Sequence, residues 1–178
     1  VAPTVRGIVP DGRGGEKVEG PTVSDNAKSR RASRVPMREQ AADVRARNFQ
    51  EVPLGYSTDE AVAEASRCLG CKKPACVEGC PVEIDIPGFV KAIAAGDFRT
   101  AIDVLKRTNQ LPAVCGRVCP QEKQCEMRCV LGRRGEPVAI GNLERFAADW
   151  EREQGQVKTP EAAAPTGRRV AVVGSGPA

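Results

Sequence analysis

Two groups of four cysteines constrain the fold of this 178-residue chain more than any other feature of its sequence. The first group reads C-x2-C-x4-C-x3-C-P and the second reads C-x3-C-P-x4-C-x3-C. Their members are Cys68, Cys71, Cys76 and Cys80, then Cys115, Cys119, Cys125 and Cys129. The chain has no histidine, so thiolates, carboxylates or amides must supply the ligands of any bound metal. Two groups of four donors therefore predict two four-ligand sites.

The predicted cellular compartment indicates whether these cysteines form disulfides or bind metal. No apolar run approaches the length of a membrane span, and the N-terminal stretch VAPTVRGIVPDG lacks the apolar segment of a signal peptide. We therefore expect a cytoplasmic protein that does not enter a membrane. Cytoplasmic thiols are kept reduced, so eight cysteines favour metal ligands over disulfides.

The spacing of the cysteines favours iron–sulfur clusters over zinc. Four-cysteine zinc sites usually combine two C-x2-C pairs across a spacer, whereas this chain has one such pair, Cys68 and Cys71. The other gaps are longer, and Pro81 and Pro120 each follow a cysteine, as in the cluster-binding runs of ferredoxins. Thiolates are soft donors that suit the irons of a [4Fe–4S] cluster. A zinc-stapled interaction module is the alternative from another functional class.

The composition fits a small domain held together by metal rather than by a large aromatic core. Aromatic residues make up 3% of the chain and hydrophobic residues 40%. Ligands that gather from distant segments around a metal supply folding free energy. We therefore expect the metal-free chain to be largely unfolded across residues 68–145. The net charge of +4 is mild and no nucleic-acid-binding motif is present, so we expect no nucleic-acid partner.

The remaining pattern divides the chain into four parts. Residues 1–36, rich in Gly, Pro, Ser and Arg, are predicted to be a flexible basic arm. Residues 37–155 are predicted to form a mainly α-helical domain that contains all the cysteines. Residues 156–167 have the composition of an Ala/Pro linker, and residues 168–178 that of the start of another domain.

Four helices are predicted in the cysteine-containing domain from apolar periodicity and capping signals. They span residues 57–68, 85–97, 97–109 and 141–155. Ser57 and Glu60 predict a capping box, and the helix that they start would deliver Cys68 inward from its last turn. Gly96 and Asp97 predict the end of the second helix and the cap of the third.

The sequence ends in RRVAVVGSGPA, a β-branched run followed by Gly174 and Gly176. Such a run is typical of the first strand and opening turn of a G-x-G-x-x-G dinucleotide-binding motif. The third glycine and the helix that would receive the pyrophosphate are absent. We interpret the chain as the front piece of a longer protein.

Three stretches together resemble the N-terminal iron–sulfur domain of the glutamate synthase small-chain superfamily. They are RCLGCKKPACVEGCPVEIDIPGFVKAI, TNQLPAVCGRVCPQEKQCEMRCVLGRRGEPVAIGNLERF and VAVVGSGPA. The resemblance extends over residues 36–178. It implies an α-helical ferredoxin-like domain with two [4Fe–4S] clusters, followed by the first strand of a truncated Rossmann-type FAD domain.

The resemblance also implies a function, that of the electron-transfer module of an NAD(P)H-dependent oxidoreductase. In glutamate synthase, electrons would pass from NADPH via FAD and the clusters to the large, glutamate-forming subunit. FAD and NADPH would bind in downstream domains, with Gly174 and Gly176 belonging to the FAD motif. The alternatives are an electron-bifurcating NADH-dependent ferredoxin:NADP oxidoreductase subunit and a sulfide dehydrogenase; dihydropyrimidine dehydrogenase has a similar module. We expect no catalytic residue in this part of the protein.

The ligand sets implied by the resemblance cross between the two cysteine groups. The first cluster would take Cys68, Cys71, Cys76 and Cys129. The second cluster would take Cys80, Cys119, Cys125 and Glu144. Spacing alone would make Cys115 a ligand, so Cys115 is the alternative fourth ligand of the second cluster. Four cations adjoin ligands and are candidates for stabilising reduced clusters: Lys72, Lys73, Arg117 and Arg128.

Overall fold

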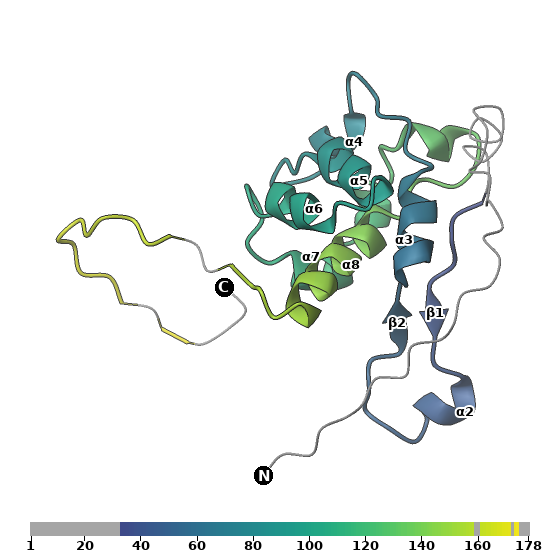
Figure 1. Cartoon of the computed structure of the whole chain (residues 1–178), viewed down its shortest axis with the longest axis horizontal. Helices are drawn as coiled ribbons and strands as arrows, with labels where there is room; N and C mark the ends of the chain where they lie inside the picture. Colours follow the sequence, from purple (N-terminus) through teal and green to yellow (C-terminus); the bar gives the residue numbers. More distant parts are fainter. Residues whose placement is uncertain (1–32, 159–160, 172, 175–178) are drawn as a thin grey trace, which may run out of the picture.

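The computed structural model describes residues 33–158, 161–171 and 173–174 (Figure 1). Its elements are β1 (Arg38–Glu39), α2 (Ala42–Arg45), β2 (Pro53–Gly55), α3 (Thr58–Ala65), α4 (Ala75–Glu78), α5 (Ile86–Ala94), α6 (Phe98–Leu105), α7 (Pro112–Val118) and α8 (Ile140–Glu153). Two 3₁₀ turns, η1 (Gln121–Lys123) and η2 (Val130–Arg133), lie between α7 and α8. The described part is mainly helical, as predicted.

Capping residues set the starts of three of the four predicted helices. Ser57 accepts a hydrogen bond from the backbone N–H of Glu60, whose side chain accepts one in return, so the capping box of α3 is confirmed. Asp85 and Asp97 cap α5 and α6 by accepting the backbone N–H three residues further on. The short helices α2, α4 and α7 were not predicted, because they are too brief to show a clear apolar period.

The helix α3 ends earlier than predicted. Its last residue is Ala65 and its C-cap is Ser66, so Cys68 lies just beyond the helix and not in its last turn. The Cys68 N–H donates to the Ala65 carbonyl at 3.1 Å, which closes a tight turn. The apolar spacing therefore continues past the point where α-helical hydrogen bonding stops.

The apolar core lies between α3, α5, α6 and α8. Its largest fully buried apolar side chains are Phe89, Val90, Ile93, Ile102, Leu105 and Leu143. At the edge of this core, the Phe98 ring packs edge-on against Phe146, with centroids 5.1 Å apart, and joins α6 to α8. The apolar stripes of the predicted helices are thus core. Cys125 is buried in the same core, and four other cysteines pack against it: Cys68, Cys76, Cys80 and Cys129.

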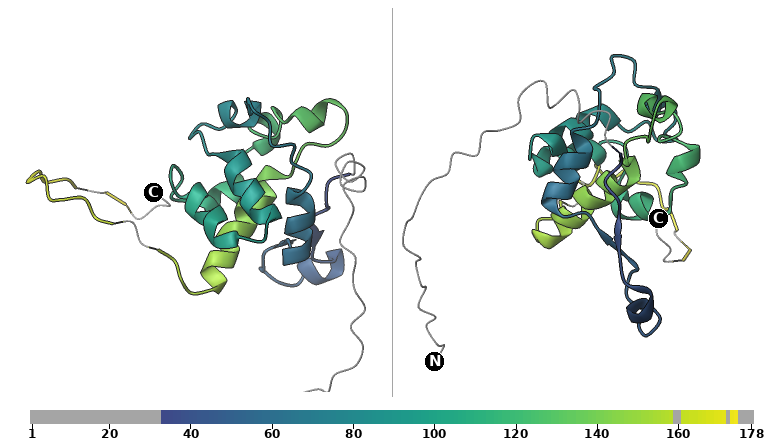
Figure 2. Two further views of the ribbon diagram at one scale, coloured as in Figure 1. Left: turned by 45° about the horizontal axis from the view of Figure 1, so that its top comes forward. Right: turned by 90° about the vertical axis from the view of Figure 1, so that its right-hand side faces the viewer.

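The N-terminal end of the described chain is bound to the helical domain. β1 and β2 pair antiparallel, and together with α2 they project from the helical body (Figure 2). Just before β1, Arg34 and Val35 form hydrogen bonds to Glu126 and Glu64, partners 92 and 29 positions away. The last residues of the predicted arm, Arg34 and Val35, thus contact the helical domain, and composition carries no signal for such distant contacts. Residues 1–32 lie outside the described part.

The described residues that follow α8 form no further helix or strand. Residues 161–171 and 173–174 are exposed and none of them is in a strand, although a strand was predicted to begin near residue 168. A β-strand is stable only when it pairs with neighbouring strands, and none lies beside this segment in the described part. The FAD domain therefore stays a prediction. Gly174 has a φ of 103°, a conformation that glycine adopts without strain, and Gly176 lies outside the described residues. Within the described ranges, no helix is long and apolar enough to cross a membrane.

Candidate metal centres

Four cysteines from two distant segments line one pocket. They are Cys68, Cys71, Cys76 and Cys129, the set that was predicted for the first cluster. Cys76 lies in α4, and Cys129 directly precedes η2; these elements lie at the same end of the molecule (Figure 1). The rest of the lining is apolar apart from Arg128. Burial, followed by the nearby thiols of Cys129 and Cys68, raises the pKa of Cys76 to about 11.

The remaining predicted donors form a second group. Burial raises the pKa of Cys119 to about 11, and the next causes are Cys115, Glu144 and Cys80. Burial also raises the pKa of Cys125 to about 12, with Glu126, Cys80 and Glu144 contributing. Cys80 and Glu144 are therefore near both thiols, and Cys115 is near Cys119. That these residues together bind one cluster stays a prediction.

Two glycines allow the close approaches that assemble the second group. A Cβ at Gly79, next to Cys80, would lie 2.7 Å from the carbonyl oxygen of Gln124, next to Cys125. A Cβ at Gly116, in α7, would lie 2.6 Å from the backbone N of Arg145, in α8. Because a side chain at either position would push two backbones apart, glycine is required where the cysteine segments meet.

Glu144 is buried in α8, with 5% of its surface exposed. Burial raises its pKa to about 7, while a 2.7 Å hydrogen bond donated by the Asn109 side-chain amide to Oε1 lowers it in part. The other end of the same amide accepts a hydrogen bond from the Cys115 thiol, with 3.6 Å between Oδ1 and Sγ. Asn109 thus lies between Glu144 and Cys115, the two candidates for the fourth ligand. Asn109 was not predicted as a site residue, because no motif or spacing in the sequence indicates its role.

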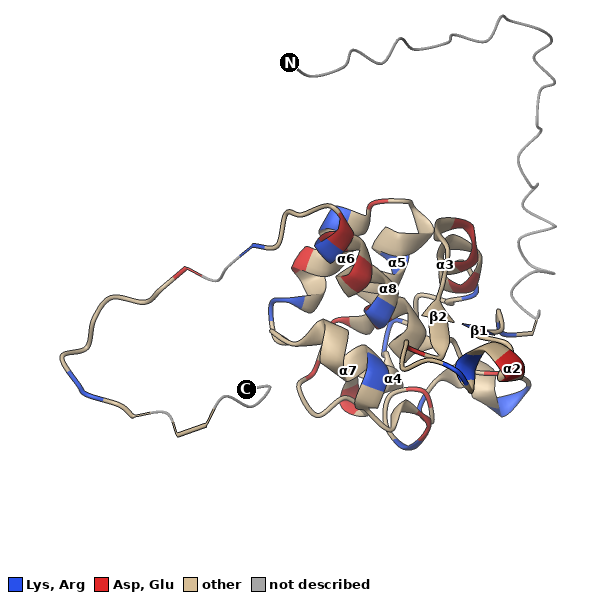
Figure 3. Cartoon of the chain, turned by 90° about the horizontal axis from the view of Figure 1, so that it is seen from below, with Lys and Arg blue, Asp and Glu red and all other residues tan. Residues whose placement is uncertain are grey.

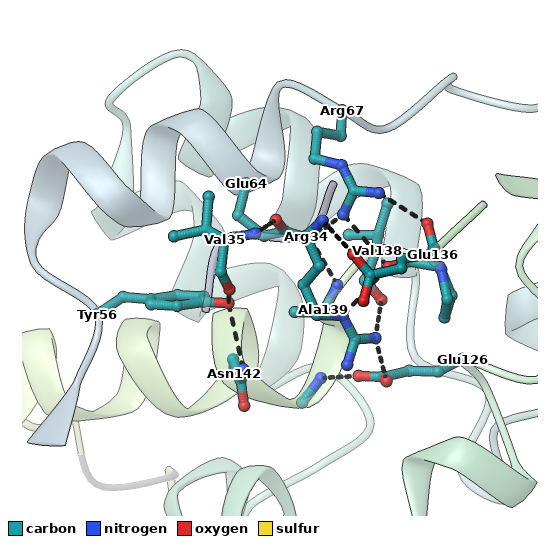
Figure 4. Close-up of polar contacts among 12 residues, drawn as sticks. Arg34, Val35, Tyr56, Glu64, Arg67, Glu126, Glu136, Val138, Ala139 and Asn142 are labelled. Carbon is teal, nitrogen blue, oxygen red and sulfur yellow. Dashed lines mark hydrogen bonds and ion pairs between the residues drawn. The ribbon is translucent and has the colours of Figure 1, made fainter. Parts of the chain in front are cut away.

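Two buried carboxylates from other parts of the chain hold the N-terminus of α8. This helix has no side-chain cap of its own. Glu64 of α3 accepts hydrogen bonds from the Ala139 N–H at 2.8 Å and from Arg67 at 2.6 Å, and Glu126 accepts one from the Gly141 N–H at 3.1 Å (Figure 4). Negative groups at a helix N-terminus satisfy its unpaired N–H groups and its dipole. These carboxylates, also missed from the sequence, fix the helix that carries Glu144.

The four candidate cations differ in their surroundings. Arg128 lines the pocket of the first group, and Lys72 and Lys73 are exposed beside Cys71. Arg117 instead forms ion pairs with Glu51 at 2.7 Å and Asp149 at 2.8 Å. Acidic and basic side chains are interspersed over the domain (Figure 3). Since its charge is already balanced by two carboxylates, Arg117 does not fit the predicted role.

The donor chemistry of both groups fits iron–sulfur clusters. No disulfide joins any of the eight cysteines, all of which lie in the described part. Among the described residues, no three Cys, Asp or Glu side chains converge as ligands of a single metal ion. The four thiols of the first group instead surround a hollow with apolar walls. Soft thiolates around such a hollow are the donors that a [4Fe–4S] cluster requires.

The chain is similar to several redox proteins. It is 40% identical over 135 residues to the glutamate synthase [NADPH] small chain of Escherichia coli K12, which is 76% of this chain and 29% of that protein. The small chain of Azospirillum brasilense is 36% identical over 148 residues, 83% of this chain and 30% of that protein. The NAD-dependent dihydropyrimidine dehydrogenase subunit PreT of E. coli K12 is 38% identical over 130 residues, 73% of this chain and 31% of that protein. The chain thus spans less than a third of each of these relatives.

A family model described as dihydropyrimidine dehydrogenase domain II, 4Fe–4S cluster, matches residues 45–156. This range contains all eight cysteines together with Asn109 and Glu144. It begins in α2 and ends just after α8, so it includes every helix that lines the two groups. Because the match covers more than half of the chain, the protein belongs to this family of 4Fe–4S cluster domains.

Proposed function

We propose that this chain is an electron-relay domain with two [4Fe–4S] clusters. The first cluster is held by Cys68, Cys71, Cys76 and Cys129, and the second by Cys80, Cys119, Cys125 and Glu144. The observation that carries the proposal is the pocket formed by four thiols from two segments that are far apart in the sequence. A cluster of this kind, when bound, takes up and releases one electron at a time.

The residues of the chain hold the iron and set its surroundings. The thiol of Cys76, with its pKa raised to about 11, has to lose its proton when it binds iron. Leu69, Val130 and Val138 supply apolar walls around the first group. At the second group Glu144 supplies an oxygen donor, which distinguishes the spectrum of that centre from that of an all-thiolate centre. Cys115 keeps its hydrogen bond to Asn109 in this proposal.

We assign the relay to an oxidoreductase of the glutamate synthase type. It would pass electrons from NADPH via FAD, bound in downstream domains that begin near residue 168, to a large glutamate-forming subunit. The 40% identity to the E. coli small chain supports this assignment. The 38% identity to PreT supports a second candidate, the same relay in a dihydropyrimidine dehydrogenase. Assaying the full-length protein with its co-purifying partner for glutamate formation and for dihydropyrimidine oxidation separates the two.

The cluster proposal is tested by anaerobic purification and reconstitution of the chain. We expect a brown sample that dithionite bleaches, with about eight irons and eight acid-labile sulfides per chain. Two electron paramagnetic resonance signals should appear on reduction, one for each centre. A colourless sample that retains zinc after reconstitution would overturn the proposal in favour of a zinc-stapled interaction module.

A further inference from the structure

Arg34 reaches into the domain from the segment that precedes β1. One of its terminal nitrogens lies 2.5 Å from a carboxylate oxygen of Glu126 and 3.4 Å from the Val138 carbonyl, and its Nε lies 3.3 Å from the Pro137 carbonyl (Figure 4). Its backbone N–H donates to Glu136 at 2.8 Å. A single side chain thus joins Glu126 to the segment that leads into α8.

Glu126 connects this arginine to the second group of donors. It directly follows Cys125 in the sequence, and its other oxygen accepts the N–H of Gly141 in the first turn of α8. Glu144 lies three residues further along the same helix, about one turn away. Glu126 therefore contacts the helix that carries one proposed ligand of the second cluster and is covalently next to another.

The Arg34–Glu126 pair is more enclosed than an ordinary surface ion pair. The side chain of Glu126 is 8% exposed and that of Arg34 is 27% exposed. Removing one partner of such a pair leaves a buried charge without compensation, which costs far more than the loss of an exposed pair. The carboxylate would then turn away to find water and would release the N–H of Gly141.

We infer that Arg34 is a positioning residue for the second cluster: it holds Glu126 against the first turn of α8 and so fixes Cys125 relative to Glu144. The inference rests on the proposed function, since it requires a cluster at these donors. It also assigns a role to the segment 33–36, whose composition alone predicts a flexible arm.

Three variants of the full chain test this inference after anaerobic reconstitution. Arg34→Gln removes the charge, and we expect the second centre to lose most of its paramagnetic signal or to shift its reduction potential downward. The first centre should be unchanged. Arg34→Lys keeps a positive charge near Glu126 but lacks the planar guanidinium group. It should therefore restore part of the paramagnetic signal of the second centre. Arg38→Gln is the matched control, because Arg38 pairs with Glu60 on the surface and both side chains are more exposed.

The readouts separate a positioning role from simple destabilisation. Iron content, the two paramagnetic signals, the two reduction potentials and the melting temperature are measured on each variant. A fall of both centres in parallel with the melting temperature, or an Arg34→Gln protein that matches the Arg38→Gln control, would overturn the inference. A wild-type chain that holds no cluster would instead overturn the proposed function itself, so the two failures are distinguishable.

Discussion

The two groups of donors differ in how deeply they are built into the helical domain. The first takes three of its cysteines from the short stretch between Cys68 and Cys76, and its pocket wall includes the exposed residues Leu69 and Val130. The second takes its donors from four places, and two of them, Cys125 and Glu144, are 7% and 5% exposed. The donors of the first group lie mostly in loops, whereas two donors of the second group belong to α7 and α8: Cys119 ends α7 and Glu144 lies in α8.

This difference separates two ways of holding a metal centre. In a site made of loops, the backbone becomes ordered only when the metal binds, so metal binding and local folding occur together. A site between packed helices is ordered in part before metal arrives, because α7 and α8 meet closely at Gly116 and Arg145. We therefore expect the second centre to respond to changes in helix packing and the first to respond mainly to its own ligands.

The largest effect should come from single ligand substitutions that test the crossed sets. Cys129→Ser should abolish the same paramagnetic signal as Cys68→Ser, although the two residues belong to different sequence groups. Cys80→Ser should abolish the other signal and leave that one intact. Each variant should lose about half of the iron, because a cluster with a missing thiolate is poorly held. Loss of the same signal in Cys68→Ser and Cys80→Ser would show that the ligand sets follow the sequence groups instead.

Removal of the metal should unfold less of the chain than its composition suggests. The core between α5, α6 and α8 is apolar and fully buried, with Phe89, Ile93, Ile102 and Leu143 at its centre. We therefore expect chelated, reduced protein to keep most of its helical circular dichroism. Hydrogen exchange should become fast in residues 68–80 and 115–133 but stay slow in these three helices. Fast exchange in α5 as well would mean that the core depends on the metal, as the sequence analysis expected for residues 68–145.

Local signals in the sequence predicted the four longer helices and singled out the eight thiols, but they did not predict the contacts that hold these parts together. Ser57, Asp85 and Asp97 act within three residues of themselves, so their caps can be read directly from the chain. Contacts such as Arg34 with Glu126 join residues 92 positions apart and leave no local pattern. For the same reason the carboxylates that cap α8 were found only in the structure.

The grouping of the donors shows a similar limit. Spacing identified eight thiols, but it could not say that Cys129 lies with Cys68 or that Glu144 lies with Cys80. That grouping came from the family resemblance, and the pocket around Cys68 and Cys129 agrees with it. Glu144 is a candidate ligand because its carboxyl group is buried beside the thiols. Its burial depends on how α7 packs against α8, and apolar periodicity alone does not predict that packing.

The buried carboxyl of Glu144 should make the metal-free protein less stable as the pH rises. Its pKa is raised from 4.5 to about 7 in the fold, so the folded state binds the proton more tightly than the unfolded state. Stability should therefore fall between about pH 4.5 and pH 7 and then level off, by about 3 kcal/mol at most. Glu144→Gln cannot ionise and still accepts the hydrogen bond from Asn109. The free energy of unfolding in urea is measured for both proteins at pH 4 and at pH 8. It should fall between these pH values in the wild type but not in Glu144→Gln. An equal fall in both proteins would contradict the argument that burial raises the pKa of Glu144.

A single methyl group at the crossing of α7 and α8 should disturb the second centre selectively. Gly116→Ala would place a Cβ 2.6 Å from the Arg145 backbone, and the helices must separate to admit it. We expect a loss of about 1–3 kcal/mol in stability and a changed signal from the second centre. The control is Gly135→Ala, because a Cβ there meets nothing within 4 Å. If the paramagnetic signal of the second centre is unchanged in Gly116→Ala, that centre does not depend on the packing of α7 against α8. The proposed difference between the two sites would then be wrong.

The smallest effect should come from the one charged side chain in the wall of the first pocket. Arg128 is exposed at its surface, so its interaction with a reduced cluster is weakened by water. Arg128→Gln should lower the reduction potential of the first centre by less than about 40 mV, the equivalent of about 1 kcal/mol for one electron. High salt should shrink the difference between variant and wild type, because salt screens exposed charges. A redox titration that finds the second centre shifted as much as the first would show that the charge of Arg128 acts on both centres. The reduction potentials would then not distinguish the loop-built site from the helix-built one.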